Sequence, residues 1–420
     1  MVKRTYCSTS FSIREAREIV KDLFRPRQWI YWTDFLLSLG IGSACFGLAR
    51  KVATPLSLFQ GVLFVVSCIA YYRAASFIHE LVHLRDGGFR GFKFAWNALC
   101  GIPFLMPSFL YRSHLAHHAR KHYGTPDDGE YLPLATRPAR EILRYMLQPL
   151  VIPALAVVRF LILAPIAWVS PRFRRFVQQR ASSLVMDPTY IRPVPTSQEL
   201  RSWRVQEACC FLLALAVAVL LLIGRWRWSF LLQCYLTAVG VLILNHLRTL
   251  GAHRFRHGGE ELTFVEQLLD SLNYPRHPLI SELWAPVGLR FHALHHLFPS
   301  LPYHNLAAAH RRLMARLPAD SPYRQTVSPG LLASLADLWR NARESANAST
   351  NTSANGGGAA GGRLHDRRLP GSRLADGRLV DGRLAEGGGL AGDGDLADGR
   401  SPADDRLSTA DRGASVSGVG

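Results

Sequence analysis

The sequence predicts an all-α integral membrane protein in which two transmembrane hairpins, four spans in all, carry a cytosolic helical cap with clustered histidines, followed by a disordered C-terminal tail. Three observations predict this class. Apolar residues gather in four blocks, each near the ~20 residues that cross a bilayer. Histidines gather in spaced groups outside those blocks, and after about residue 341 the composition shifts to small and charged residues.

The four apolar blocks are too concentrated for the core of a soluble protein, although 48% hydrophobic content in 420 residues would allow one. The third block is apolar on every face and lies beside Trp226 and Trp228, as expected at a membrane interface. The blocks cover residues 34–49, 55–72, 208–224 and 229–245.

Two further apolar stretches are interrupted by prolines, and we expect them to be interfacial or re-entrant. Residues 143–170 contain Pro149, Pro153, Pro165 and Arg159, and residues 93–110 are shorter. If the histidine groups share one site, the chain crosses the membrane an even number of times between them. The hairpin turned by residues 224–227 already supplies these crossings, so both termini and the site are expected in the cytosol.

Four regions follow along the chain: a cytosolic N-terminal segment (1–29), a membrane domain (30–316), a helical extension (317–340) and a disordered tail (341–420). No apolar run precedes about residue 34, which argues against a cleavable signal peptide. The net charge of +18 comes from arginines beside apolar blocks, a pattern of cytosolic loops and anionic head groups rather than nucleic-acid binding. The seven cysteines show no CxxC spacing and are interpreted as small hydrophobic residues.

Eight of the sixteen histidines fall into three groups whose members share a helix face, because positions i, i+3 and i+4 are neighbours on a helix. The groups are His79 and His83; His114, His117 and His118; and His292, His295 and His296. A catalytic zinc takes about three protein ligands, so eight imidazoles predict two metals. Imidazole binds several transition metals, and a membrane-facing site that keeps positions open for O2 beside an apolar chain favours iron.

Two other classes compete with this interpretation. "HELVH" is also the signature of zinc peptidases, in which His79 and His83 would bind zinc, Glu80 would activate water and Asp128 would be a third ligand. That reading leaves six histidines unused. In a metal transporter or sensor, the histidines would line a crossing helix, whereas here they lie outside the predicted spans.

The order HxxxH, HxxHH, HxxHH, interleaved with two hydrophobic hairpins, resembles the membrane-bound fatty acid desaturase and hydroxylase superfamily over about residues 30–316. The stretch "HHLFPSLPYHNL" (295–306) is also similar to the sequence after the last histidine box in that family. The resemblance implies a di-iron centre with the eight grouped histidines as ligands. It also implies a ninth ligand after the fourth span, where we favour His253 over His246 and His257.

The resemblance further implies an oxidoreductase that uses O2 and two electrons to desaturate an acyl chain of a membrane lipid. Hydroxylases and ketolases share the same boxes and remain alternatives. The short HxxxH spacing of the first box favours lipid-linked substrates. No HPGG haem motif is present, so electrons are expected from a separate donor of ferredoxin or cytochrome b5 type with its reductase.

The remaining polar residues near the boxes are expected to have supporting roles. Glu80 is a candidate hydrogen-bond partner for an imidazole N–H. The acidic residues of "YGTPDDGEY" are interpreted as a solvated loop, with imidazole partnership as the alternative, and the outlying histidines as orienting groups or head-group contacts rather than ligands. These residues are Asp127, Asp128, Glu130, His122, His304 and His310.

Overall fold

The computed structural model describes residues 11–54, 56–84 and 86–356, and within them the chain is helical, with three isolated β-bridges and no strand. The α-helices are α1 (Ile13–Val20), α2 (Gln28–Lys51), α3 (Leu58–His83), α4 (Asp86–Trp96), α5 (His114–His118), α6 (Arg140–Leu147), α7 (Ile152–Val157), α8 (Ala164–Val169), α9 (Pro171–Arg180), α10 (Ser197–Leu222), α11 (Trp228–Ala252), α12 (Phe264–Asp270), α13 (Pro278–Trp284), α14 (His292–Leu297), α15 (Leu306–Arg316) and α16 (Leu331–Gly356). Short 3₁₀ and π segments are η1 (Lys21–Phe24), η2 (Asn97–Gly101), η3 (Ser108–Tyr111), η4 (Leu134–Thr136), η5 (Gln148–Leu150), η6 (Val158–Leu163), η7 (Tyr303–Asn305) and η8 (Pro322–Thr326).

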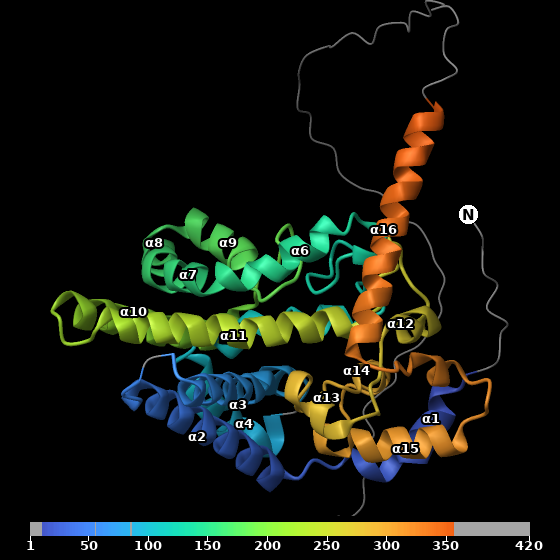
Figure 1. Cartoon of the computed structure of the whole chain (residues 1–420), viewed down its shortest axis with the longest axis horizontal. Helices are drawn as coiled ribbons and strands as arrows, with labels where there is room; N and C mark the ends of the chain where they lie inside the picture. Colours follow the sequence, from blue (N-terminus) through green and yellow to red (C-terminus); the bar gives the residue numbers. More distant parts are fainter. Residues whose placement is uncertain (1–10, 55, 85, 357–420) are drawn as a thin grey trace, which may run out of the picture. The chain divides into compact units, whose positions relative to one another are not determined.

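The first hairpin is formed by α2 and α3, which pack closely against each other (Figure 1). Ser57 caps α3 by accepting a hydrogen bond from the Gln60 N–H. Gly42 permits the close approach, because a Cβ there would lie 2.7 Å from Cδ1 of Tyr71. Helix α3 then continues unbroken to His83, so the first histidine group extends directly from the apolar stretch.

The second hairpin is formed by α10 and α11. Helix α10 begins at a capping box in which Thr196 and Glu199 satisfy each other's backbone N–H groups. The turn between the helices contains Gly224 at φ +72°, a conformation that glycine adopts without strain. Helix α11 packs against α3 and ends next to His253, so both hairpins deliver histidines to one end of the bundle.

Five helices in the described part of the chain are long and apolar enough to cross a membrane, one more than the four spans predicted from the sequence. Helices α2 and α11 contain two of the predicted apolar blocks, and α3 and α10 contain all but the ends of the other two. The fifth covers Ile152–Val169, inside the stretch that we expected to be interfacial or re-entrant. The protein is therefore a multi-pass membrane protein whose apolar helices exceed the sequence prediction by one.

The fifth apolar helix follows a segment that runs alongside α11. Tyr145 stacks on His246 near the last turns of α11, and the backbone oxygen of Leu150 then accepts a hydrogen bond from Tyr235, about three turns nearer to the start of α11. Arg159 next pairs with Glu207, which directly precedes the apolar part of α10. The chain thus runs from the last turns of α11 toward the apolar middle of that helix and then returns to the polar end of α10.

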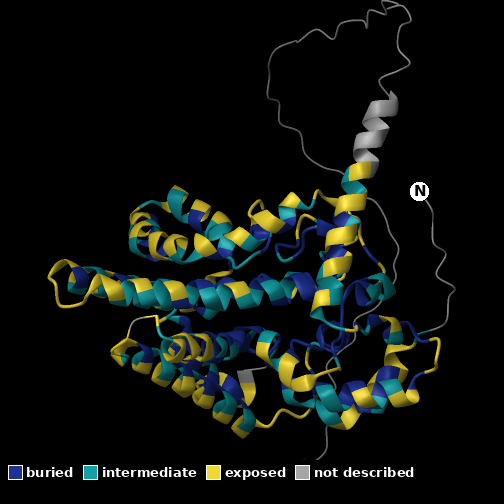
Figure 2. Cartoon of the chain, viewed as in Figure 1, coloured by how far each residue is buried: buried dark blue, intermediate teal, exposed yellow. Residues whose placement is uncertain are grey.

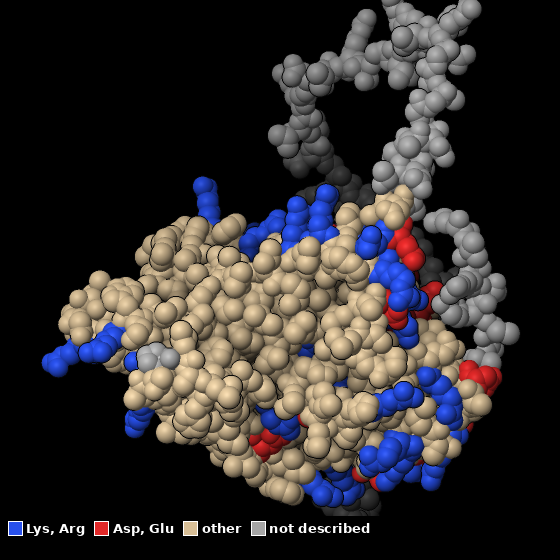
Figure 3. All heavy atoms as spheres, viewed as in Figure 1, with Lys and Arg blue, Asp and Glu red and all other residues tan. Residues whose placement is uncertain are grey.

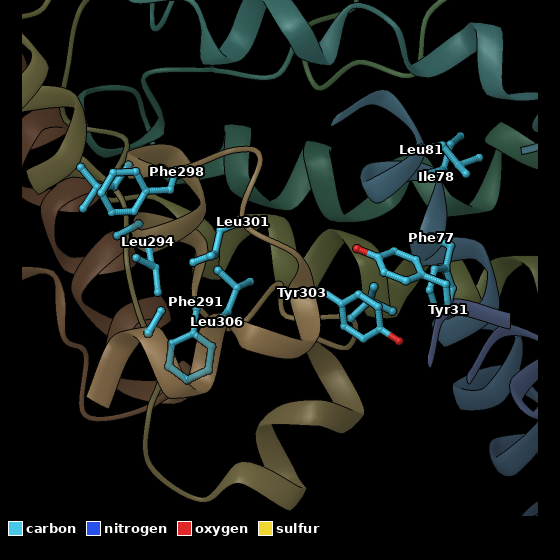
Figure 4. Close-up of a cluster of buried hydrophobic side chains, with 14 of the residues drawn as sticks. Tyr31, Phe77, Ile78, Leu81, Phe291, Leu294, Phe298, Leu301, Tyr303 and Leu306 are labelled. Atoms are coloured by element: carbon cyan, nitrogen blue, oxygen red, sulfur yellow. The ribbon is translucent and has the colours of Figure 1, made fainter. Parts of the chain in front are cut away.

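At the histidine-bearing end, helices α12 to α15 and α1 pack around the ends of the hairpins (Figure 1). Asn273 connects this region: its Nδ2 donates to Thr326, its Oδ1 accepts from the Leu294 N–H, and its backbone pairs with Phe291. Figure 4 shows the apolar residues of α14 and the following segment, such as Phe298 and Leu301, in one cluster. This packing fixes the third histidine group.

The distribution of exposed and charged residues matches a bilayer around the hairpins. Exposed and half-buried residues alternate along α2 and along the hairpin of α10 and α11, while buried residues gather near α12 and α14 (Figure 2). Figure 3 shows a broad uncharged surface over the hairpins and many Lys and Arg residues over α1, α15 and α16.

Helix α16 crosses the predicted boundary between the extension and the tail. It continues to Gly356, and Ala342 is fully buried in it. The boundary predicted at residue 341 therefore falls inside a helix. Residues 357–420 of the predicted tail lie outside the described residues, as do residues 1–10 of the N-terminal segment.

Candidate metal centre

The three predicted histidine groups lie on three short helical stretches that converge from distant parts of the sequence. The first occupies the last turns of α3, the second is α5 itself and the third opens α14. His253 joins them from the end of α11, where its backbone forms a β-bridge with Ser271. All nine histidines predicted as ligands are brought together.

The nine imidazoles divide into two sets, each with its possible ligand atoms within 4.8 Å of one another. The first set contains five residues and the second four. The first is His79, His83, His114, His118 and His295; the second is His117, His253, His292 and His296. Consecutive histidines of α5 therefore belong to different sets, because His117 is in the second set and His118 is in the first.

Apart from His79, each member of the two sets has its Nε2 within 3.2 Å of the Nε2 of another member. The Nε2–Nε2 distances are 2.9 Å between His114 and His118 and 3.1 Å between His118 and His295. In the second set they are 2.9 Å between His253 and His292 and 3.1 Å between His292 and His296. Two nitrogens bound at about 2.1 Å and at right angles to one cation would lie about 3.0 Å apart, so the spacing fits a metal in each set.

The opposite ring nitrogens of three histidines are held by acidic or phenolic oxygens. Nδ1 of His114 lies 2.9 Å from Glu130, and Nδ1 of His117 lies 2.8 Å from Asp128. Because these oxygens accept hydrogen bonds, each Nδ1 carries the proton and each Nε2 is left with its lone pair facing the set. The sequence interpretation of these acidic residues as a solvated loop is wrong for Asp128, which is 1% exposed, and for the half-buried Glu130.

His253 is oriented through a tyrosine. The Tyr123 hydroxyl lies 2.8 Å from Nδ1 of His253 and also 2.8 Å from Asp270. The hydroxyl has one proton, which it donates to the carboxylate of Asp270, so it accepts from the Nδ1–H of His253. Nε2 of His253 then faces the second set as an electron-pair donor, in the same state as the carboxylate-held histidines.

Burial keeps most of these imidazoles neutral. It lowers the pKa of His118, His295 and His296 well below the ordinary value for histidine. Burial acts in the same direction on His117, but the charge and hydrogen bond of Asp128 outweigh it and raise the pKa of His117. Neutral imidazole is the form that binds metals.

Several buried nitrogens have no protein partner among the described residues. Both ring nitrogens of His79, a member of the first set, are buried and unpaired. Buried polar atoms are normally hydrogen-bonded, so a buried imidazole of the first set without any hydrogen-bond partner indicates that another group completes the site. A pair of metal ions fits this arrangement.

The zinc-peptidase alternative does not match the geometry. The carboxylate of Glu80 accepts a hydrogen bond of 2.8 Å from the Tyr31 hydroxyl rather than facing a water between His79 and His83. The same contact shows that the predicted pairing of Glu80 with an imidazole N–H is wrong, since no histidine is hydrogen-bonded to it in the described chain. Asp128 orients His117 instead of completing a three-ligand zinc site.

Five of the described histidines that we did not predict as ligands make other contacts. His246 stacks on Tyr145, and His257 lies 3.8 Å from Asp270. His310 hydrogen-bonds to Tyr323, and Nε2 of His304 accepts from a backbone N–H. His122 lies 3.6 Å from Asp127 at the surface.

Sequence reasoning missed Tyr123, Asp270 and Arg248. The guanidinium of Arg248 is buried near the end of α11, beside the hydroxyls of Tyr72 and Tyr111, and its Nε has no partner among the described residues. A charged residue within an apolar helix is costly, and this signal alone marks Arg248 in the sequence. Tyr123 and Asp270 carry no comparable local signal.

A bundle of apolar helices that ends in two sets of converging imidazoles defines a membrane protein with a candidate two-metal centre. The chain belongs to the fatty acid desaturase family, whose model, described as fatty acid desaturase, matches residues 53–327. It is also 39% identical over 337 residues to a protein of Caulobacter vibrioides (strain NA1000 / CB15N) named ceramide hydroxylase, an alignment that covers 79% of this chain and 94% of that protein. The resemblance stated from the histidine boxes is thereby confirmed, and the protein is an oxidoreductase of lipid metabolism.

Proposed function

We propose that this protein is a membrane-bound di-iron hydroxylase that inserts oxygen into a C–H bond of a ceramide. The observation that carries the proposal is the similarity to a ceramide hydroxylase over 94% of that protein's length. The sequence prediction placed desaturation first and hydroxylation second. The similarity supports hydroxylation better, so the order is reversed.

In this proposal the nine histidines of the two sets hold two irons, five imidazoles on one and four on the other. Iron bound there would supply the activation of O2 and the attack on an unactivated C–H bond. The overall change is balanced when one C–H bond, O2, two electrons and two protons give a C–OH group and water. The electrons come from a separate donor of ferredoxin or cytochrome b5 type.

The side chains around the histidines have defined tasks. Glu130, Asp128 and the Tyr123–Asp270 pair each hold an Nδ1–H, which fixes the direction of the Nε2 lone pair. The surrounding buried residues keep bulk water from the centre. Whether a chain loses two hydrogens or gains oxygen depends on where its C–H bond is held, so the residues that hold the lipid decide the outcome.

The topology that best suits this function keeps two crossing hairpins. We infer that Ile152–Val169 is re-entrant, because Tyr145 and Arg159 on either side of Leu150 lie near the polar ends of α11 and α10. An even number of crossings then separates the histidine groups. Both termini and the metal centre lie on the cytosolic side in this arrangement.

The test is to express the protein in cells that contain ceramide, purify it in detergent, and measure both metal content and lipid masses. The proposal expects about two irons per chain and a ceramide product heavier by one oxygen. A product lighter by two hydrogens would restore desaturation as the activity. One zinc per chain with unchanged lipids would refute the di-iron assignment.

A further inference from the structure

A polar cavity of about 270 Å³ lies between α3, α13 and the segment that follows the third histidine group, apart from the two histidine sets. Its volume is close to the lower end of the range for small-molecule sites. It is lined by Arg73, Glu282, Gly288, Arg290, Tyr303 and Ala307, together with Phe291 and His304.

The charges around this cavity are paired within the protein. Arg73 binds Asp34 through two hydrogen bonds of 2.6 Å and Glu282 through one of 2.9 Å. Arg290 binds the other oxygen of Glu282 at 3.0 Å. Two guanidinium groups therefore pair with two carboxylates, of which Glu282 lines the cavity and Asp34 lies behind Arg73, and this paired group has no excess charge to attract a phosphate.

Hydrogen-bonding capacity nevertheless remains. The bonds of Arg290 use its Nε, to Glu282, and one N–H of its Nη1, to the backbone oxygen of Tyr274, which leaves one N–H of Nη1 and both of Nη2. Burial lowers the pKa of His304, whose Nε2 accepts from the backbone N–H of the exposed Arg27. The cavity thus offers donors to a neutral ligand without offering a net charge.

The position of the cavity is at the edge of the bilayer. Helix α13 packs against α3 and α11 just beyond their apolar stretches, and it carries three exposed apolar side chains, Leu279, Ile280 and Leu283. On the same short helix, Glu282 turns to the cavity. A helix with exposed leucines beside transmembrane helices lies in the membrane interface, so the cavity is level with lipid head groups.

The lining of the cavity is also adjacent in sequence to a candidate metal ligand. Phe291 lines the cavity and is followed directly by His292 of the second set. A lipid whose polar end occupied the cavity would therefore lie against a residue adjacent in sequence to a candidate metal ligand.

We propose that this cavity binds the uncharged polar head of the lipid substrate, the amide and hydroxyl groups of a ceramide. The inference rests on the proposed function for the identity of the lipid. The head accepts hydrogen bonds from Arg290, and the apolar residues of α13 lie among the chains of neighbouring lipids.

The test is to reduce the volume of the cavity by enlarging a side chain that lines it. Ala307→Leu places a larger apolar side chain in the cavity, and Ala307→Val fills it less. Ala308→Leu is the matched control, because Ala308 is the next residue of α15, is similarly half-buried and does not line the cavity. Retained metal content and a single elution peak identify variants that fold.

Binding of labelled ceramide is measured from phosphatidylcholine vesicles, with phosphatidylglycerol as the anionic competitor. Loss of the hydrogen bonds from Arg290 is expected to raise the half-saturating ceramide concentration about tenfold in Ala307→Leu, less in Ala307→Val and not in Ala308→Leu. Unchanged binding in folded Ala307→Leu would overturn the inference. Displacement of ceramide by phosphatidylglycerol would overturn the neutral specificity.

The same assay separates this inference from the proposed function. If ceramide binds in a manner that Ala307→Leu weakens but is never oxidised by the iron-loaded wild type, the cavity is supported and the hydroxylase assignment fails. If ceramide is oxidised equally well by wild type and Ala307→Leu at limiting lipid, the hydroxylase assignment stands and the cavity inference fails.

Discussion

The carboxylate of Asp128 offers a sharp test of the second histidine set. One oxygen accepts from Nδ1 of His117 at 2.8 Å and from the Gly124 N–H at 3.0 Å, and the other accepts from the Glu130 N–H at 2.9 Å. All three partners are donors. In Asp128→Asn one acceptor becomes an NH2 group, so a donor must face a donor whichever way the amide turns.

The cost follows from this geometry. If the NH2 group faces His117, the imidazole must move its proton to Nε2, which removes one of the four ligands of the second set. If it faces Glu130, the loop that holds Asp128 is strained. Loss of such a partner weakens metal binding about 10- to 100-fold, equivalent to about 1.4–2.8 kcal/mol. The first set lacks His117 and should keep its metal.

The assay is iron content per chain during titration with a chelator. Asp128→Asn is expected to lose the iron of the second set at a chelator concentration about 10- to 100-fold lower than the wild type and to retain the iron of the first set. Asp127→Asn is the control, because this substitution removes the same charge from the neighbouring residue, whose side chain is 78% exposed. Equal retention of both irons by the two variants would refute the role given to Asp128.

Two further predictions concern single histidines. His253→Ala should abolish lipid oxidation and lower the iron content. His257→Ala, four residues away and 22% exposed, should leave both close to the wild type. The reverse result would identify His257 rather than His253 as the ninth ligand. Burial lowers the pKa of His310 from its ordinary 6.5 to about 4, so its neutral form contributes up to about 3 kcal/mol of stability, present in full above pH 6.5 and lost as the pH falls toward 4. The melting temperature of His310→Gln should therefore fall less between pH 7 and pH 4.5 than that of the wild type, and parallel curves would show that His310 does not carry this effect.

Much of the site follows from local spacing. Groups such as His114, His117 and His118 share a helix face, and their shared face predicts metal binding before any fold is known. The sequence alone does not show that His117 and His118 belong to different sets, because that division depends on how α5 lies between α3 and α14. Local periodicity cannot report such packing.

The partners of the ligands were harder to predict. In "YGTPDDGEY" the acidic residues have the composition of a solvated turn, and only the packing around them buries Asp128. Tyr123 and Asp270 are 147 residues apart in the chain and meet only in the folded protein. The choice between hydroxylation and desaturation is finer still, since it depends on the position of one C–H bond.

The division of the nine histidines also sets the order in which the protein can be completed during synthesis. His79, His83, His114 and His118 emerge early, but the fifth member of their set, His295, emerges after both hairpins. Of the second set, only His117 precedes α11. A nascent chain that has inserted one hairpin therefore lacks one member of the first set and three members of the second, so both sets are complete only after the second hairpin and α14 have been made.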